Sequence, residues 1–292
     1  MVYLRSFALP GVSAESAFLA RDWENKRTCY TSRYPFGVFL SRELPRLEFE
    51  PVTILCGGNG SGKTTILNLI GEKLGLARGA VFNRSSFFGA YLELCRAEVA
   101  PAFRGPTLEN SKVITSDDVF DYLLDFRYMN EGIEHRRREL LEEYADARYA
   151  TFQLRSLEDV DRLRQVVEAQ RKTGSRYVRD RVMNDVPGKS NGESAFLYFT
   201  REIREDGLYL LDEPENSLSP QLQLELTEFL ENSARFYRCQ FVISTHSPFL
   251  LSMRGARIYD LDSGPVQVRP WTQLPHVRTY FEFFREHRDE FT

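Results

Sequence analysis

Apolar runs and amphipathic stretches alternate along the second half of the chain. Residues 208–211 and 240–244 are apolar segments of strand length, typical of buried parallel strands, and residues 257–261 predict a third. Residues 221–232 between them carry leucine and phenylalanine at helical spacing. The aromatic-rich, amphipathic residues 279–291 predict a last helix docked on the core. This alternation predicts an α/β fold whose mainly parallel sheet is covered by helices.

The first half begins with a different pattern. Residues 2–8 alternate apolar and polar side chains, as an antiparallel strand does. Residues 34–40 and 46–50 have strand-like composition and are separated by Pro45. Residues 52–55 form an apolar, strand-like run that leads into the next segment. We therefore expect N-terminal antiparallel strands that lead into the parallel sheet.

The middle of the chain is strongly helical and rich in charge. Ser116 followed by two acidic residues is a helix N-cap pattern, and residues 117–187 read as a helical insertion or lid. Within it, residues 171–181 hold five Lys or Arg against one Asp. Such a strip is either a solvated, ion-paired helix face or a surface for a nucleic-acid backbone.

Composition adds limits to this picture. The 292 residues are 42% hydrophobic, enough for a large core, and we treat residues 1–292 as a single domain carrying the insertion. The net charge of −4 gives no global reason to bind nucleic acid. Apolar runs are too short to span a bilayer, and no signal peptide is visible. Four scattered cysteines indicate thiols in a reducing, cytoplasmic setting.

Residues 57–64 carry the chemistry around which the chain is organised. They fit G-x-x-x-x-G-K-[ST], the phosphate-binding P-loop, between a strand and a helix. Glycines let backbone N–H groups approach the phosphates, and the helix N-terminus adds positive charge. Lys63 reaches the β and γ phosphates of ATP, and the Thr64 hydroxyl binds Mg²⁺. The nucleotide-binding residues predicted here are Gly57, Asn59, Gly60, Ser61, Gly62, Lys63, Thr64 and Thr65.

An aromatic side chain before the loop is the expected stacking partner of the adenine. Tyr30, Tyr34 and Phe36 are the candidates, with ordinary core packing as the alternative for each.

Two acidic residues end the strand at 208–211. Asp212 is placed to complete the Mg²⁺ site with Thr64, because carboxyl ends of parallel strands present ligands at one edge of a sheet. Glu213 then stands where it can activate the attacking water as a general base. Similarly, His246 follows the strand at 240–244 and is placed to contact the γ-phosphate.

The whole set resembles the ABC-type ATPases, and within them the soluble SMC, RecF and OLD-like AAA-family ATPases. Residues 57–64 match Walker A and residues 208–215 match Walker B. Residues 216–220 match the D-loop, residues 244–248 the switch-histidine motif, and residues 190–193 occupy the place of the signature sequence. These matches fall in the family's order along most of the chain.

The resemblance implies a head domain whose two copies enclose two ATP molecules. Ser190 and Gly192 of one subunit would then complete the phosphate site of the other. Two departures stand out: Asn191 replaces the usual signature glycine, and Ser116-Asp117-Asp118 stands where a Q-loop glutamine is expected. The separation of Lys63 and Asp212 leaves no room for a long coiled-coil arm.

The resulting hypothesis is a cytoplasmic, Mg²⁺-dependent ATPase that dimerises around ATP and moves a partner protein or a nucleic acid. One alternative is the ATPase component of an antiphage-defence or DNA-repair complex that works with a separate nuclease or effector. Others are the nucleotide-binding subunit of a membrane transporter and a small-molecule kinase. The adjacent acids Asp212 and Glu213 suit attack by water better than transfer to an acceptor.

Overall fold

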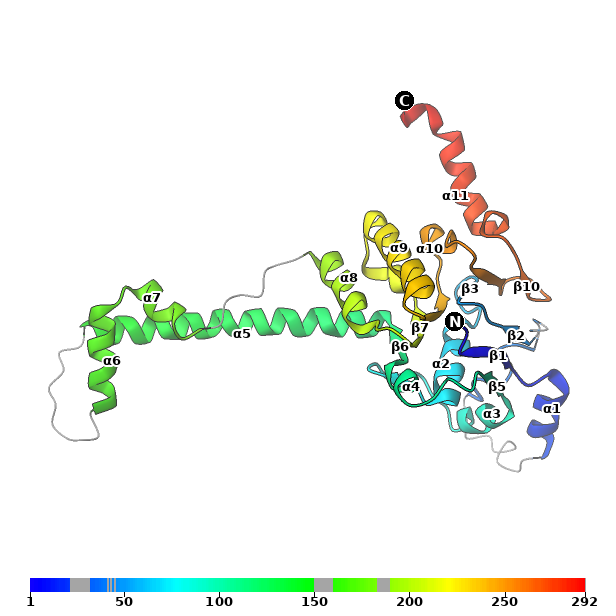
Figure 1. The fold of residues 1–292 in the computed structure, drawn as a ribbon, viewed down its shortest axis with the longest axis horizontal. Helices are drawn as coiled ribbons and strands as arrows, with labels where there is room; N and C mark the ends of the chain where they lie inside the picture. The colour runs from blue at the N-terminus through cyan, green and yellow to red at the C-terminus, as the bar shows by residue number, and fades with distance from the viewer. Residues whose placement is uncertain are drawn as a thin grey trace. The chain divides into compact units, whose positions relative to one another are not determined.

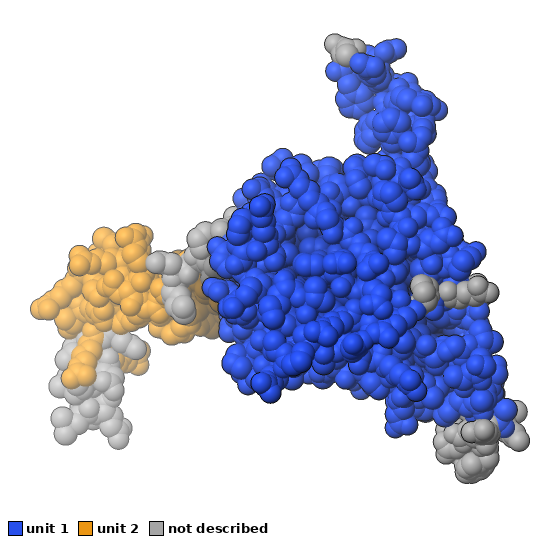
Figure 2. Space-filling view, turned by 45° about the vertical axis from the view of Figure 1, so that its right-hand side comes forward, with its two compact units in different colours: residues 1–120, 191–292 blue, residues 121–190 orange. Residues whose placement is uncertain are grey.

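The protein folds into two compact units. The computed structural model describes residues 1–21, 32–40, 42, 44, 46–149, 160–182 and 190–291. One unit consists of residues 1–120 and 191–292 and the other of residues 121–190 (Figure 2). The second unit thus overlaps the segment for which the sequence predicts a helical insertion.

The core of the first unit is a seven-stranded sheet in the order β10-β9-β3-β8-β7-β6-β4 (Figure 1). Its strands are β3 (Val52–Cys56), β4 (Ala77–Arg78), β6 (Lys112–Thr115), β7 (Leu208–Asp212), β8 (Gln240–Ser244), β9 (Arg257–Asp260) and β10 (Gln267–Val268). Neighbouring strands are parallel except β9 and β10. Strands β3, β7 and β8 are almost entirely buried, as their continuous apolar sequences predict. The predicted α/β fold with a mainly parallel sheet is confirmed.

A second, antiparallel sheet has the order β2-β1-β5. It consists of β1 (Leu4–Ala8), β2 (Leu47–Glu48) and β5 (Arg96–Val99). The antiparallel N-terminal strand expected from residues 2–8 is therefore present.

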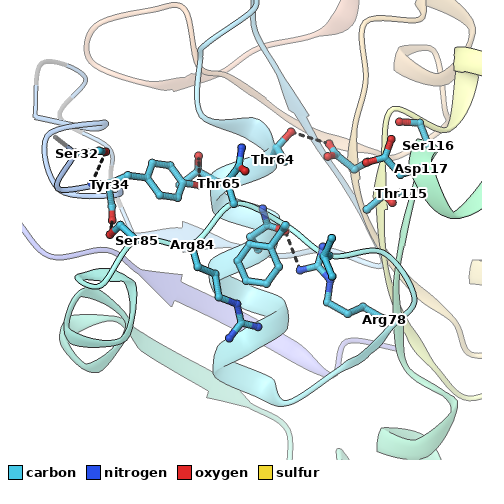
Figure 3. A pocket seen from close by; sticks show the side chains of 15 residues that line it. Ser32, Tyr34, Thr64, Thr65, Arg78, Arg84, Ser85, Thr115, Ser116 and Asp117 are labelled. Atoms are coloured by element: carbon cyan, nitrogen blue, oxygen red, sulfur yellow. Dashed lines mark hydrogen bonds between the residues drawn. The ribbon is translucent and has the colours of Figure 1, made fainter. Parts of the chain in front are cut away.

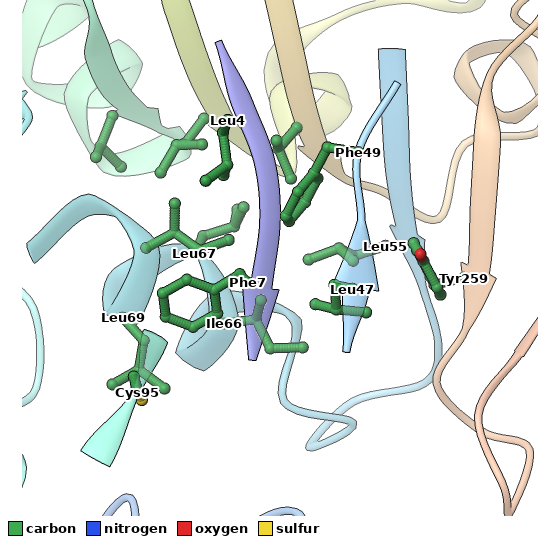
Figure 4. Close-up of a cluster of buried hydrophobic side chains, with 14 of the residues drawn as sticks. Leu4, Phe7, Leu47, Phe49, Leu55, Ile66, Leu67, Leu69, Cys95 and Tyr259 are labelled. Atoms are coloured by element: carbon green, nitrogen blue, oxygen red, sulfur yellow. The ribbon is translucent and has the colours of Figure 1, made fainter. Parts of the chain in front are cut away.

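Helix α2 (Lys63–Leu74) lies between the two sheets and carries the P-loop at its N-terminus. Its side chains, among them Ile66 and Leu69, are buried with Leu4 and Phe7 of β1 in one cluster (Figure 4). Residues 65–71 are buried without a break, so this part of α2 is covered on all sides. Gly71 permits the close approach, because a Cβ there would lie 2.7 Å from Val113 Cγ2. The start of α2 is consequently fixed against both sheets.

The remaining helices of the first unit surround this core. They are α1 (Val12–Arg21), α3 (Phe88–Leu94), α4 (Pro106–Asn110), α8 (Asn191–Glu202), α9 (Pro220–Phe236), α10 (Pro248–Leu251) and α11 (Pro275–Glu286), with 3₁₀ turns η3 (Pro214–Ser217), η4 (Trp271–Gln273) and η5 (Arg288–Phe291). Helix α9 packs against α8, α10 and β8. The Ser219 hydroxyl caps its start by accepting from the Leu222 N–H (3.4 Å).

The second unit is helical. Helix α5 (Ser116–Tyr149) enters it from the first unit and, at 34 residues, is about 50 Å long. Helices α6 (Val160–Arg171) and α7 (Gly174–Arg179) pack with it around a small cluster of Leu140, Ala169, Tyr177 and Val178. The helical character predicted from residue 117 onward is present in the described part of this segment.

The prediction of a strand at residues 34–40 is wrong. This segment forms consecutive turns, with the Phe36 N–H donating to the Arg33 carbonyl (2.9 Å) and the Val38 N–H to Pro35 (3.2 Å). Gly37 has φ +89°, which lies outside the extended region and breaks any strand. Phe36 and Phe39 are nevertheless buried. Burial of aromatic side chains from turns therefore imitated a strand pattern in the sequence.

The expectation that the last helix docks on the core along its length is also wrong. Only the first turn of α11 is buried, at Val277, and the helix then extends away from the sheet (Figure 1). Its aromatic side chains at 280, 281, 283 and 284 are 51–54% exposed. The amphipathic pattern identified a helix with an apolar face but not what covers that face.

Candidate functional site

Three neighbouring strands end at one place on the sheet edge. β3 leads into the P-loop, β8 into Thr245 and His246, and β7 into Asp212 and Glu213. β8 lies between β3 and β7, so the histidine segment separates the two Walker strands. Carboxyl ends of parallel strands in an open sheet are the usual location of ligand sites. The residues predicted from distant parts of the sequence are thus brought together.

The P-loop depends on glycine at two places. Gly62 has φ +94°, and a Cβ there would lie 2.5 Å from Phe39 Cε1. Gly60 also has a positive φ, of +76°, with open space where its Cβ would be. A pocket of about 210 Å³ is lined by residues 59–65 together with Glu213. Backbone N–H groups, Lys63 and a carboxylate therefore face one volume.

Lys63 lines this pocket and is in direct contact with His246. The buried ammonium of Lys63 donates to the Gly57 carbonyl (2.7 Å) and the Gly58 carbonyl (3.3 Å). It also lies 2.7 Å from His246 Nε2, which accepts because an ammonium only donates. Two groups able to donate to a phosphate are therefore within one hydrogen bond of each other.

Thr64 and Asp212 form the candidate metal site. The Thr64 hydroxyl donates to Asp212 Oδ1 (3.2 Å), and the Ser244 hydroxyl donates to the same oxygen. Burial raises the pKa of Asp212, while these two hydrogen bonds lower it. Hard oxygen ligands from one carboxylate and one hydroxyl fit Mg²⁺, which keeps its other positions for water and phosphate. The described residues contain no cluster of three His, Cys, Asp or Glu that could hold a metal ion.

Glu213 is held in an unusual backbone conformation. It has φ +48° and ψ +54°, a left-handed geometry that costs a non-glycine residue about 1–2 kcal/mol. Its N–H donates to the Ser244 carbonyl (2.9 Å), and Asn216 Nδ2 donates to its Oε2 (3.0 Å). The other oxygen lies 3.8 Å from His246 Nε2. Strain of this kind is typical of functional positions and aims the carboxylate at the P-loop pocket.

Two residues that the sequence reasoning missed hold the P-loop from outside. Asp262, just after β9, accepts the Gly58 N–H at 2.7 Å. Arg42 donates to the carbonyls of Ser61 and Gly60. No local motif marks either residue, because both contacts depend on the sheet order and on the turns at 34–40.

A third missed residue is His276, in the first turn of α11. Its ring nitrogens lie 3.7 and 3.9 Å from Cys56 Sγ, and its centroid is 6.4 Å from that of His246. Burial, followed by the charge of His246, lowers the pKa of His276, whereas Asp260 and Asp262 raise it. Burial raises the pKa of the Cys56 thiol to about 12. The base of α11 is thus in contact with the strand that carries the P-loop.

A larger cavity of about 830 Å³ opens beside Thr64, Thr65 and Asp212 (Figure 3). Of the three aromatic candidates for adenine, Tyr34 lines this cavity and donates its hydroxyl to Thr65 Oγ1 (3.0 Å). Phe36 is core, stacked on Phe18, and Tyr30 lies outside the described residues. The part of the cavity that is lined by Tyr34, Thr64 and Thr65 is therefore polar and adjoins the P-loop.

The opposite wall of this cavity is cationic. Arg78 and Arg84 both lie over the Phe82 ring, at 4.1 and 4.4 Å from its centroid. Asp117 also lines the cavity, while Asp118 is buried and accepts from the Thr115 N–H and hydroxyl. Of the two acids standing in the Q-loop position, Asp118 therefore serves the start of α5.

The signature-like residues occupy the start of α8 and the residue before it. Gly192 packs so closely on α9 that a Cβ would lie 2.8 Å from Leu222 Cδ1. Ser190 and Asn191 are exposed. This contact is with the movable end of a leucine side chain, so it only favours a small residue here. The role of Ser190 and Gly192 across a dimer stays a prediction.

The basic strip at residues 171–181 is partly neutralised. Lys172 pairs with Glu168 (2.7 Å) and Asp180 (2.6 Å), and Arg181 pairs with Glu168 (2.6 Å). Arg181 also lies 3.7 Å from the centroid of the Tyr177 ring. The ion-paired face weighed from the sequence accounts for these two cations.

Comparison with known proteins supports the same assignment. Residues 179–252 match the sequence model of a family described as AAA domain, putative AbiEii toxin, Type IV TA system. That range includes the signature-like stretch, Asp212, Glu213 and His246, and it confirms the resemblance to AAA-family P-loop ATPases there. None of the curated proteins compared matches this sequence. No helix in the described part of the chain is both long and apolar enough to cross a membrane.

Solved structures with detectable likeness include two SMC heads. One is the Smc head domain with an extended coiled coil bound to the C-terminal domain of ScpA, from Pyrococcus furiosus, at 14% identity and a TM-score of 0.45, covering 99% of this chain and 100% of that chain. Another is an SmcHead bound to the C-winged helix domain of ScpA, at 14% identity and a TM-score of 0.42, covering 91% of this chain and 97% of that chain. A dimeric, post-hydrolysis ATP-binding cassette bound to ADP and Pi has 17% identity and a TM-score of 0.37, and the match covers 77% of this chain and 88% of that chain. Likenesses of this size add nothing to what the topology shows by itself.

Proposed function

We propose that this protein is a Mg²⁺-dependent ATP hydrolase that acts as a switch. The observation that carries the proposal is the convergence of Lys63, Asp212, Glu213 and His246 at the ends of β3, β7 and β8. Lys63 Nζ, the P-loop N–H groups and the helix N-terminus bind the phosphates of ATP. The cavity that adjoins Thr65 and Tyr34 accepts the nucleoside.

Hydrolysis follows from the placement of two side chains. Glu213 orients a water molecule and accepts its proton as the water oxygen bonds to the γ-phosphorus. The bond from that phosphorus to the bridging oxygen breaks, which releases ADP and phosphate. His246, which lies beside Lys63, donates to the γ-phosphate once ATP is bound. Thr64 and Asp212 hold Mg²⁺, which when bound neutralises charge on the β and γ phosphates.

The test of this function is Glu213→Gln. The amide keeps the size of the side chain but accepts no proton, so kcat should fall by about 10²–10⁴-fold while ATP stays bound. Glu228→Gln, at an exposed position of α9, is the matched control and should hydrolyse ATP normally. Release of phosphate is measured together with ATP affinity. Normal turnover by Glu213→Gln would show that another group activates the water.

We further propose that two copies enclose ATP, with Ser190 and Gly192 of each completing the other's site. Glu213→Gln should then accumulate an ATP-dependent dimer in sedimentation. Ser190 is exposed, so Ser190→Arg leaves the fold intact and should prevent that dimer. A mixture of Glu213→Gln and Ser190→Arg chains tests whether the two residues act in one site across the dimer. In each mixed dimer one site then combines an intact Glu213 with an intact Ser190 from the other chain, so activity should be partly recovered. A Ser190→Arg chain that dimerises and hydrolyses ATP normally contradicts the trans site.

The load of the switch is proposed to be a partner protein or a nucleic acid. The matched family is described as a putative toxin of a type IV TA system. That description favours, as a second candidate, the ATPase component of an antiphage-defence or DNA-repair complex with a separate nuclease or effector. The buried free thiols Cys56, Cys95 and Cys239 fit a reducing, cytoplasmic setting. Isolation of the complex from its host, with and without ATP, tests which partner is bound.

A further inference from the structure

One buried carboxylate joins the two segments that carry Glu213 and His246. Glu215 lies in η3, two residues after Glu213, and its Oε1 accepts three hydrogen bonds from the loop after β8. The donors are the Thr245 hydroxyl (2.7 Å), the His246 N–H (2.7 Å) and the Ser247 N–H (3.2 Å). Every residue of the histidine loop from 245 to 247 is therefore held by one oxygen atom.

The second oxygen of Glu215 is unusual. Oε2 is buried and has no hydrogen-bond partner among the described residues. Burial raises the pKa of Glu215, while the donors from His246 and Thr245 lower it. All three donors from the histidine loop meet the other oxygen, Oε1, so the contacts of this carboxylate are concentrated on that loop. A shorter amide or a hydroxyl would satisfy fewer of the three donors.

The geometry also shows where this contact acts. Pro214 links Glu213 to Glu215 with a fixed φ, so the two carboxylates are joined by a stiff connection. On the far side of the loop, the Ser247 hydroxyl donates to Gln223 of α9 (2.7 Å). The loop that carries His246 is thus held by the Glu213 turn on one side and by helix α9 on the other, and the His246 ring contacts Lys63.

We propose that Glu215 is the positioning residue that fixes His246 relative to Lys63 and Glu213. This inference rests on the proposed function of His246 at the γ-phosphate. Glu215 does not line the P-loop pocket; it acts by holding the His246 backbone in register with the Glu213 turn.

Glu215→Ala is the principal variant. Removal of the shared acceptor should lower kcat by about 10–100-fold, as expected when a catalytic group is displaced by about 1 Å, and leave ATP affinity within about threefold. Glu215→Gln keeps an oxygen acceptor and should recover most of the rate. Thr245→Val removes one of the three donors and should cost less than Glu215→Ala. Because Glu215→Ala can also impair folding, each variant is compared by thermal unfolding.

A double-mutant cycle with His246→Ala decides between positioning and general stability. If Glu215 acts through His246, adding Glu215→Ala to His246→Ala should change kcat by less than twofold. A full additional loss, or a loss of ATP affinity as large as that of kcat, would overturn the proposal. So would a Glu215→Ala enzyme with normal turnover. Failure of the underlying function is recognised separately, because wild-type protein would then release no phosphate from ATP.

Discussion

Replacement of Gly62 by alanine tests whether the P-loop needs its glycine for conformation or for space. The residue has φ +94°, which costs a non-glycine residue about 1–2 kcal/mol. The new Cβ would in addition lie 2.5 Å from Phe39 Cε1, and overpacking of this kind costs about 1–3 kcal/mol. The total of about 2–5 kcal/mol appears either as lower stability or as a displaced loop that binds ATP more weakly.

Gly60→Ala separates the two contributions. Gly60 also has a positive φ, but no atom lies within 4 Å of its Cβ position, so this variant should lose only about 1–2 kcal/mol. Gly89→Ala, inside α3 with open space around it, should be neutral or slightly stabilising. Thermal unfolding measures the loss of stability in the three variants, and ATP titration measures the loss of affinity. A tenfold change in Kd corresponds to about 1.4 kcal/mol.

The reasoning fails if Gly62→Ala behaves no worse than Gly60→Ala in both assays. The contact with Phe39 would then be irrelevant. A second check is Phe39→Leu in the Gly62→Ala background, which should recover part of the loss because the smaller side chain leaves room for the Cβ. No recovery would place the whole effect in the backbone conformation.

Two further predictions concern other parts of the molecule. Because burial lowers the pKa of His276, its folded form resists protonation, and stability should fall as pH drops below about 6.5 towards that lowered pKa. His276→Gln should therefore lose less thermal stability between pH 7.5 and 5.5 than the wild type, and equal acid sensitivity contradicts this. If the second unit binds DNA through the exposed Arg171, Arg176 and Arg179, changing all three to Glu should weaken binding and flatten its salt slope by about 3. An unchanged slope would move the DNA contact elsewhere.

The chemistry of the nucleotide site could be predicted from local sequence. A P-loop is a short, continuous segment whose glycines, lysine and hydroxyl act together wherever the fold places them. Asp212, Glu213 and His246 were also found locally, because each follows an apolar run that can only be a buried strand. The α/β class follows from the same runs.

The arrangement of those strands required the tertiary structure. β8 lies between β3 and β7, and this order alone brings His246 to within 2.7 Å of Lys63. Strand order depends on long-range packing, to which periodicity along the chain is insensitive. The predictions for residues 34–40 and for the apolar face of α11 were wrong for a related reason. Apolar side chains in the sequence indicate a surface that can be buried, but they do not show which element covers it.

The sequence by itself therefore predicted a nucleotide as the ligand and named the groups proposed to react, because such predictions rest on short motifs. The tertiary structure decided how those groups are held. Asp262 and His276 contact the P-loop and its strand from segments that are distant in sequence and carry no motif. Glu215 ends the Walker B match, but its partner His246 lies about thirty residues further along the chain. Their importance arises from hydrogen bonds and burial across the sheet, and such contacts exist only after the strands have taken their places.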